Sequence, residues 1–286
     1  MAHATSETSL TSTEVFNERS ELATEAETNQ PPHPIRVRTG ADDDDDDNNK
    51  WQLAGGARKG WSAWLSDEIA PSAAVPAMLV VSFSTSLLDS IMLSIYSCFA
   101  TNQTGNTILL ALATHHRGRK LTLTATSMAG FVGAGLVFGQ LGARCGHRKR
   151  GWILFSLVYQ TILLFLFSFM VSPSAPIQLQ QYGSYEWISM LVAAVQGGPQ
   201  IVMGTTIEPL MPTGMVTSVI VGVLSDPKLF FWGRSRVRDL RVVYLATFVS
   251  GALAGLAIEQ VTSAWFSSLM SAILKVIAIG MVAYIK

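Results

Sequence analysis

The amino-acid sequence predicts an all-α polytopic membrane protein with about six transmembrane helices and two short broken or re-entrant helices. Six apolar runs of 17–26 residues hold almost no charge, and each is long enough to cross about 30 Å of hydrocarbon. Two further apolar runs are too short to cross, and both follow strings of polar residues, glycine or proline. The length of the long runs and the interruptions before the short ones define the expected fold.

The formal net charge of zero hides two unlike parts of the chain. Residues 1–70 hold fourteen acids and six Lys or Arg, which gives −8, while residues 71–286 hold six acids and fourteen Lys or Arg, which gives +8. We interpret residues 1–50, which include six consecutive Asp, as a disordered acidic tail, because they cannot bury enough apolar area to offset the entropy of ordering. Residues 51–70 place three Trp near Arg58 and Lys59, which suits a segment at the membrane interface.

The membrane domain is expected over residues 71–286. Its first and last spans each hold one charge, Asp89 and Lys275, and the four spans between them hold none. The fourth span is interrupted by Gly197-Gly198-Pro199, and the fifth, with 17 residues, has the minimum length for a crossing. The six spans cover residues 75–100, 121–143, 152–172, 187–207, 242–258 and 263–285.

The two short apolar runs indicate an internal repeat. One follows TNQTGN at 101–106, the other follows EPLMPTG at 208–214, and the TGNT of the first recurs in part as TGMV. Each is followed by a charged loop and a helix with small residues at G-x-x-x-G spacing, which lets helix backbones approach closely. The same order of elements therefore occurs twice, over roughly residues 75–172 and 187–285. The predicted packing residues are Gly135, Gly139, Gly251 and Gly255.

The basic loops predict the orientation. If each short element returns to the side it came from, each half crosses three times and the halves are inverted. Nine Lys or Arg of two loops then lie on one face against three in HHRGRK at 115–120, whereas eight crossings would divide them eight to four. The positive-inside rule favours six crossings with both termini in the cytosol.

The stretch LLDSIMLSIYSCFATNQTGNT at 87–107 resembles the YoaK-like membrane proteins of bacteria and fungi, the domain of unknown function 1275 family. The first helix of that family carries an Asp followed, after an apolar stretch, by Thr-Gly-Asn-Thr, and the matching positions here are Asp89 and residues 104–107. PTGMVTSVIVGVLSDP at 212–227 is similar to the second half of the fungal branch, and RKRGW at 148–152 to its basic loop. The resemblance covers roughly residues 75–286. It implies a multi-pass membrane protein of uncharacterised role and supplies no catalytic residues.

The interrupted segments are the candidate functional site. Non-helical backbone persists at membrane depth only where it is buried in protein or lines a wet cavity, and paired interrupted segments mark the binding site of many transporters. The starts of the short helices would also present positive dipole ends to an anionic or polar group. The alternative is that both strings are ordinary polar loops at the membrane surface. The residues assigned to a substrate or ion pathway are Asp89, Asn102, Thr104, Gly105, Asn106, Thr213, Gly214 and Lys275.

Asp89 and Lys275 lie near the middle of their spans, where an isolated charge costs at least about 2.5–3.5 kcal/mol. We therefore hypothesise a buried Asp89–Lys275 ion pair, either direct or bridged by a solute or water. The competing interpretations are a protonated Asp89 bonded to Ser or Thr, and a Lys275 side chain that reaches the interface. Four glutamines in the spans either line the interior or join neighbouring helices: Gln140, Gln160, Gln196 and Gln200.

Two function classes remain open. No G-x-S-x-G, H-E-x-x-H or G-x-x-x-x-G-K-[ST] motif occurs, so we expect neither an enzyme nor a cofactor or metal site. The first class is a permease or secondary transporter for a small polar or anionic solute, and the second is a non-transporting scaffold or assembly factor. The expected partners are the lipid bilayer, a small-molecule solute for a transporter and a second copy of the chain, but not nucleic acid. Without a sorting motif the plasma membrane is the default location.

Overall fold

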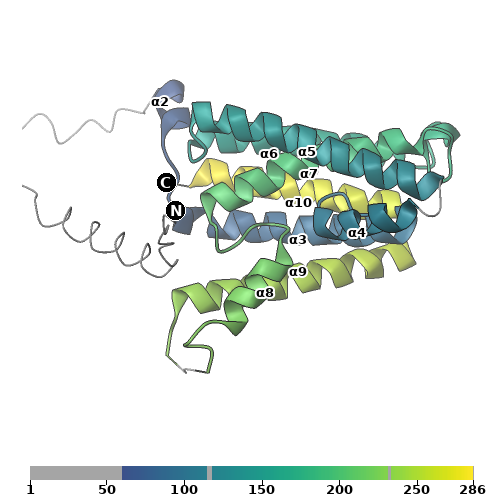
Figure 1. The fold of residues 1–286 in the computed structure, drawn as a ribbon. Coiled ribbons are helices and arrows are strands. Elements are labelled where there is room, and N and C mark those ends of the chain that lie inside the picture. Colours follow the sequence, from purple (N-terminus) through teal and green to yellow (C-terminus); the bar gives the residue numbers. More distant parts are fainter. Residues whose placement is uncertain (1–59, 115–117, 231–232, 286) are drawn as a thin grey trace, which may run out of the picture. The chain divides into compact units, whose positions relative to one another are not determined.

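The computed structural model describes residues 60–114, 118–230 and 233–285. Within these ranges the chain forms nine α-helices and one short 3-10 helix, η1 (Ile177–Leu179), and its one extended pairing is an isolated bridge between Glu68 and Lys149 (Figure 1). The predicted all-α class is confirmed. The acidic tail predicted for residues 1–50, and residues 51–59 of the predicted interfacial segment, lie outside the described residues, while the short helix α2 (Trp61–Ser66) occupies part of the rest of that segment.

Six helices are long and apolar enough to cross a membrane, as predicted. The shortest has 21 residues and the longest 27, so they extend over about 31–40 Å at 1.5 Å per residue, against about 30 Å of hydrocarbon. The protein is therefore a multi-pass membrane protein. The six helices are α3 (Pro71–Tyr96), α5 (Arg119–Cys145), α6 (Arg150–Met170), α7 (Glu186–Ile207), α9 (Arg236–Val261) and α10 (Ala264–Tyr284).

The interruption predicted at Gly197-Gly198-Pro199 is wrong, because α7 runs through it without a break. A Cβ atom on Gly198 would lie 2.6 Å from the Gly135 nitrogen of α5 and 3.0 Å from its Cα, so glycine here lets α5 and α7 touch through their backbones. Membrane helices also tolerate an internal proline where their neighbours satisfy the freed backbone group. These residues therefore serve helix packing and do not end the helix.

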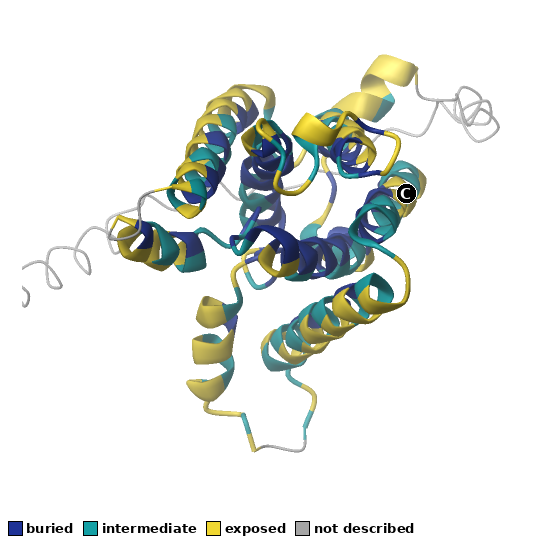
Figure 2. Cartoon of the chain, turned by 90° about the vertical axis from the view of Figure 1, so that its right-hand side faces the viewer, coloured by how far each residue is buried: buried dark blue, intermediate teal, exposed yellow. Residues whose placement is uncertain are grey.

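Four helices, α3, α6, α7 and α10, enclose the interior of the bundle. Helix α10 packs against α3 and α6, and α6 packs against α7; buried residues gather where these helices face one another (Figure 2). Helix α5 packs against α7 from outside, and α9 packs against α3. The two outer helices keep exposed apolar side chains, such as Leu136 on α5 and Leu253 on α9, which suits contact with lipid tails.

The two short helices are α4 (Gln103–Ala113) and α8 (Val216–Leu224). With 11 and 9 residues they extend over about 17 and 14 Å, roughly half of the hydrocarbon thickness. Helix α4 packs against α5, and α8 packs against α9. Neither short helix can cross the membrane by itself, which agrees with six crossings.

The packing of the helices has a two-part order. Each helix of the first half has a counterpart in the second: α3 corresponds to α7, α4 to α8, α5 to α9 and α6 to α10. When each helix is replaced by its counterpart, the helix contacts described above become one another. The contact of α5 with α7 becomes that of α9 with α3, and the contact of α6 with α7 becomes that of α10 with α3. The predicted sequence repeat pairs the same elements. A duplication of the chain remains a prediction, and this packing is the arrangement that a duplication would give.

The helices exchanged in this way run in opposite directions. At one end of the bundle the start of α6 meets the end of α10, where Arg150 Nη2 donates to the Ile285 carbonyl oxygen over 2.7 Å, and α3 also begins at this end (Figure 1). At the opposite end the last turn of α3 meets the loop before α7, where Gln181 Nε2 donates to the Ile95 carbonyl oxygen over 2.8 Å. Ion pairs place the start of α5 beside the start of α7, and the start of α9 beside the end of α7. The long helices of the two halves are thus mutually inverted.

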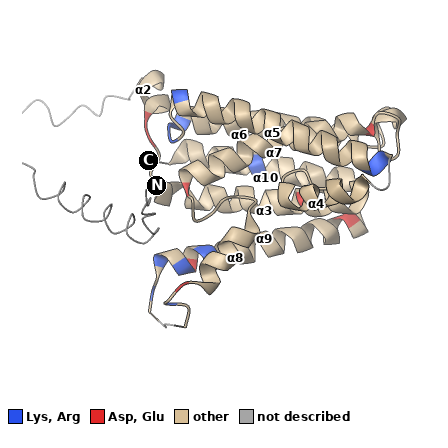
Figure 3. Cartoon of the chain, viewed as in Figure 1, with Lys and Arg blue, Asp and Glu red and all other residues tan. Residues whose placement is uncertain are grey.

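Positive charge is concentrated at the end of the bundle where α6 begins, which we call the basic end (Figure 3). Among the described residues the opposite end carries Arg119 and Lys120, at the start of α5. The positive-inside rule therefore predicts that the basic end faces the cytosol. The cations at the basic end are Arg144, Arg148, Lys149, Arg150, Lys228, Arg234, Arg236, Arg238 and Arg241.

Cysteine labelling tests this orientation. A membrane-impermeant maleimide is expected to modify native Cys145 only from the cytosolic side, because Cys145 is exposed at the basic end whereas Cys98 is buried. In a Cys145→Ser background, Lys120→Cys and Ser184→Cys should react only from the other side. Modification of Lys120→Cys from the cytosol alone would indicate eight crossings and contradict the inverted order.

Candidate functional site

The starts of the two short helices line one space between them. A cavity of about 460 Å³ is lined by residues 101–104, residues 214–218, Phe131 of α5 and Ile201 of α7. Phe131 lies close to the middle of α5, so the cavity is within the depth of the long helices. We call it the α4–α8 cavity. The structure therefore brings together the two interrupted segments, which are more than 100 residues apart in the sequence.

Side chains hold the segment ahead of α4 where helical hydrogen bonds are missing. Ser97, with a φ of 56°, ends α3 in the left-handed region. The buried Asn106 then binds the turn from both sides: its Oδ1 accepts from Phe99 N over 2.9 Å, and its Nδ2 donates to Phe99 O over 2.8 Å and to Ser127 Oγ of α5 over 3.0 Å. These bonds satisfy backbone groups that would otherwise be unpaired at membrane depth.

The predicted pathway residues of this segment divide into two kinds. Asn102 and Thr104 line the α4–α8 cavity, and Asn102 also caps α4, its Oδ1 accepting from Gly105 N over 3.4 Å. Gly105 and Asn106 do not line the cavity. A Cβ atom on Gly105 would lie 2.6 Å from Cε2 of Phe99, so these two positions build the turn.

The segment ahead of α8 is anchored to α7. Thr213 is buried, has a φ of 32°, and donates through Oγ1 to the Gln200 carbonyl oxygen over 3.3 Å. Gly214 follows it and lines the cavity. Met215 is the N-cap of α8 and makes no side-chain capping bond, so the positive end of the α8 dipole faces the cavity without a capping side chain.

Asp89 is bound by the turn that follows its own helix. Its Oδ1 accepts from the backbone nitrogens of Ala100 and Thr101, each over 2.9 Å, and its Oδ2 accepts from the Thr101 hydroxyl. Both Asp89 and Thr101 are buried. Thr101 was not among the residues predicted from the sequence, although it opens the TNQTGN string, and a hydroxyl at the start of such a string was the available signal.

Asp89 also lines a second cavity, of about 360 Å³, between α3 and α9. Ser86 and Ser90 of α3 and Phe248 of α9 form part of its wall, and Asn102 lines both this cavity and the α4–α8 cavity. We call the second space the Asp89 cavity. The turn after α3 thus separates two cavities, with a carboxylate on one side and the Thr101 side chain on the other.

Lys275 of α10 lies at the centre of a buried amide cluster. Its Nζ donates to Oε1 of Gln160 over 2.9 Å, and to Oε1 of Gln196 and of Gln200 over 2.6 Å each. An ammonium group has three hydrogens and no acceptor, so these three bonds satisfy it. Gln200 Nε2 in turn donates to the Thr85 hydroxyl of α3, and the cluster therefore joins all four inner helices.

The predicted direct ion pair between Asp89 and Lys275 is wrong. Among the described residues no carboxylate oxygen lies within ion-pair distance of Lys275, and Asp89 is bonded to its own turn. Each charged group is instead hydrogen-bonded to neutral groups: Asp89 to two backbone nitrogens and a hydroxyl, and Lys275 to three amide oxygens. Lys275 is buried, with 1% of its surface exposed, so it does not reach the interface either.

Three of the four glycines selected for packing lie in helix contacts. Cβ atoms on Gly251 and Gly255 would lie 2.5 and 2.6 Å from carbonyl oxygens of α3, and one on Gly135 would lie 3.5 Å from the Gly198 Cα of α7. Gly139 is the exception, because a Cβ there would meet no atom within 4 Å. The glycines of α9 are thus used to bring α9 onto α3.

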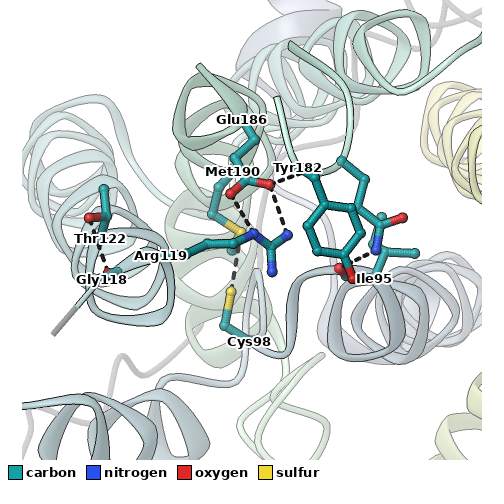
Figure 4. Close-up of polar contacts among 9 residues, drawn as sticks. Ile95, Cys98, Gly118, Arg119, Thr122, Tyr182, Glu186 and Met190 are labelled. Carbon is teal, nitrogen blue, oxygen red and sulfur yellow. Dashed lines mark hydrogen bonds and ion pairs between the residues drawn. The ribbon is translucent and has the colours of Figure 1, made fainter. Parts of the chain in front are cut away.

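An ion pair that the sequence did not reveal closes the opposite end of the bundle (Figure 4). Arg119 Nε lies 2.5 Å from Glu186 Oε1, and Arg119 Nη2 donates to Glu186 Oε2 over 2.8 Å. Glu186 Oε2 also accepts from Tyr182 N over 2.8 Å, and the Arg119 guanidinium lies 4.4 Å from the centre of the Tyr182 ring. The paired residues are 67 positions apart and belong to no common motif, so the sequence carries no signal that would join them.

Comparison with known proteins identifies the chain at the level of family. The family described as Protein of unknown function (DUF1275) matches residues 77–281, which is most of the chain. No curated protein and no solved structure gives a significant match. The described residues also contain no group of three or more His, Cys, Asp or Glu that could hold a metal ion.

Proposed function

The chain belongs to the DUF1275 family, whose function is unknown, and we propose that it is a permease or secondary transporter for a small polar or anionic solute. The α4–α8 cavity carries this proposal, because interrupted segments from both halves of the chain meet there. Transporters built from inverted halves bind their substrates at such a place, between discontinuous helices whose starts point at the substrate.

The lining of the α4–α8 cavity suits a small solute with hydrogen-bonding groups. Its volume of about 460 Å³ is in the lower half of the range of about 300–1,000 Å³ for ligand pockets. Four hydroxyl groups and two amide side chains lie among apolar residues, and none of the lining residues is charged. Two helix starts add positive potential, so the cavity favours a neutral polar or an anionic solute over a cation.

The alternative of a scaffold receives less support from the packing. That alternative depends on glycine-rich helix faces that are free to bind a partner. Gly251 and Gly255 are used against α3, and Gly135 is used against α7. Gly139 leaves part of α5 open, which is a small surface compared with a binding face along a whole helix.

Filling the cavity is expected to abolish solute binding. A panel of small polar solutes, scored by thermal shift of the full chain in detergent, should contain compounds that stabilise the wild type, by about 2.7 kcal/mol at 100 times the dissociation constant. Thr104→Phe should remove this stabilisation, because Thr104 is exposed to the cavity. Thr107→Phe is the matched control, since Thr107 is also exposed on α4 but does not line the cavity.

The same solutes should accumulate in proteoliposomes that contain the wild type or Thr107→Phe. A panel without any stabilising solute, together with no uptake, would contradict the proposal. So would a Thr104→Phe variant that binds and transports as the wild type does.

A further inference from the structure

Asp89 and Thr101 form a wall between the two cavities. Asp89 lines the Asp89 cavity, Thr101 lines the α4–α8 cavity, and the adjacent Asn102 lines both. The two side chains are joined by a hydrogen bond from the Thr101 hydroxyl to Asp89 Oδ2. A change in the protonation of Asp89 on one side therefore acts directly on a group that faces the solute on the other side.

The carboxylate of Asp89 is the acceptor in each of its three hydrogen bonds. Ala100 N and Thr101 N donate to Oδ1, and the Thr101 hydroxyl donates to Oδ2. An ionised carboxylate accepts hydrogen bonds only, and a hydroxyl group has a single hydrogen to donate. While Asp89 is ionised, the one hydrogen of Thr101 is used on the carboxylate and is not offered to the α4–α8 cavity.

Protonation of Asp89 reverses this bond. A proton that reaches Asp89 through its cavity and binds Oδ2 makes that oxygen a donor, and the Thr101 Oγ is the acceptor already in contact with it. The hydroxyl hydrogen of Thr101 must then turn away from Asp89. Since Thr101 lines the α4–α8 cavity, the freed hydrogen can be donated to an acceptor atom of a solute there.

The balance of buried charge also favours an anion once Asp89 is protonated. Asp89 is the one titratable residue in the lining of its cavity, to which α9 contributes Phe248, Ala252 and Leu256, and the α4–α8 cavity is lined by none. Among the described residues, the titratable groups near Asp89 are Lys275 of α10, Cys98 of the turn and Glu259 of α9, which accepts from Ser94 Oγ of the cavity wall over 2.9 Å. Lys275 is bonded to neutral amides, so protonation of Asp89 leaves one positive charge in the interior uncompensated.

Resting on the proposed function, we propose that the solute is a small monovalent oxyanion, such as a carboxylate, and that it binds together with one proton carried by Asp89. The anion would accept the freed Thr101 hydrogen and compensate the positive charge. The proton and the anion then enter with no net charge, which is the least costly way to place a charged solute inside the membrane. By linkage, each of the two ligands raises the affinity for the other.

The test compares lactate with lactamide, a neutral analogue of similar shape, on the full chain in detergent. Lactate is expected to bind more tightly in mildly acidic than in mildly alkaline buffer, by up to about tenfold per pH unit for one coupled proton. Lactamide should bind weakly at every pH. Pyruvate and acetate extend the panel to other monovalent carboxylates.

Variants of the wall separate the proton site from the hydroxyl. Asp89→Asn places an amide N–H where the protonated acid has its O–H, so lactate should bind tightly at every pH. Thr101→Val should weaken lactate binding by at least about tenfold, and Thr101→Ser, which restores the hydroxyl, should recover it. Thr107→Val is the matched control, because Thr107 does not line the cavity and its hydroxyl donates to Gln103 O over 2.8 Å.

The outcomes distinguish this inference from the proposed function. If lactamide or other neutral solutes bind the α4–α8 cavity and lactate does not, transport stands and the oxyanion is wrong. If lactate binds with the same affinity at every pH, or if Thr101→Val binds it as the wild type does, the coupling through Asp89 is wrong. If no solute of either kind binds or is transported, both proposals are wrong.

Discussion

Alanine in place of Gly255 is expected to lower the melting temperature of the protein in detergent by several degrees, equivalent to about 1–3 kcal/mol of overpacking. The added Cβ would lie 2.6 Å from the Leu87 carbonyl oxygen and 3.1 Å from the Leu87 Cα of α3. Both are backbone atoms of a buried helix and cannot turn aside. Helix α9 would have to move away from α3, which would also open the Asp89 cavity that the two helices form.

Gly139→Ala is the matched control for this change. It adds the same methyl group to a glycine of the other outer helix, where no atom lies within 4 Å. Alanine is a better helix former than glycine by about 1 kcal/mol, so this variant should melt at the same temperature as the wild type or higher. Equal losses for both variants would show that the contact of α9 with α3 does not depend on a missing side chain.

Leucine in place of Gln200 should also destabilise the protein strongly. The change removes one of the three acceptors of Lys275 and the donor to Thr85, and leaves a buried ammonium group with two acceptors. Removing one partner of a buried charge costs about 3–5 kcal/mol when the charge is left uncompensated, and an average hydrogen bond between membrane helices contributes about 0.6 kcal/mol. Because two amides remain, we expect a loss of about 2 kcal/mol, measured by thermal melting in detergent.

A double-mutant cycle separates this contact from a general loss of packing. Gln200→Leu combined with Lys275→Met removes the charge as well as its acceptor, so the pair should be less destabilising than the sum of the single changes. Gln140→Leu is the control, because Gln140 is exposed on α5 and should tolerate leucine. Strictly additive losses for Gln200 and Lys275 would contradict the observed bond.

The sequence predicts the fold well because the thickness of the membrane sets the length that an apolar run needs to form a spanning helix. Six apolar runs long enough to cross, and two that are not, lead directly to the observed helices. Helix ends were less predictable: α5 and α9 begin in the charged loops at Arg119 and Arg236, ahead of the apolar runs that marked them. Gly197-Gly198-Pro199 resembles a helix interruption in the sequence, but in the structure it is the surface on which α7 packs against α5.

The candidate site could be predicted only in part. Polar strings beside short helices revealed Asn102, Thr104 and Gly214, because such strings need a special environment at membrane depth. The partners of Asp89 and Lys275 depend on how each helix is rotated about its axis, and opposite charge alone suggested the wrong pair. Local geometry decided the matter, since the turn after α3 places two backbone nitrogens and a hydroxyl around Asp89.

The separate bonding of the two buried charges bears on how the protein enters the membrane during its synthesis. The partners of Asp89 follow it by 11 and 12 residues, so they leave the ribosome almost together with it. The partners of Lys275 precede it by 75, 79 and 115 residues, and all three have been translated before α10 is made. A direct ion pair with Lys275 would instead have left Asp89 without a partner until α10, the last helix, was synthesised. With the bonds as they are, Asp89 can be inserted together with its partners, and Lys275 can be inserted after its partners have been made.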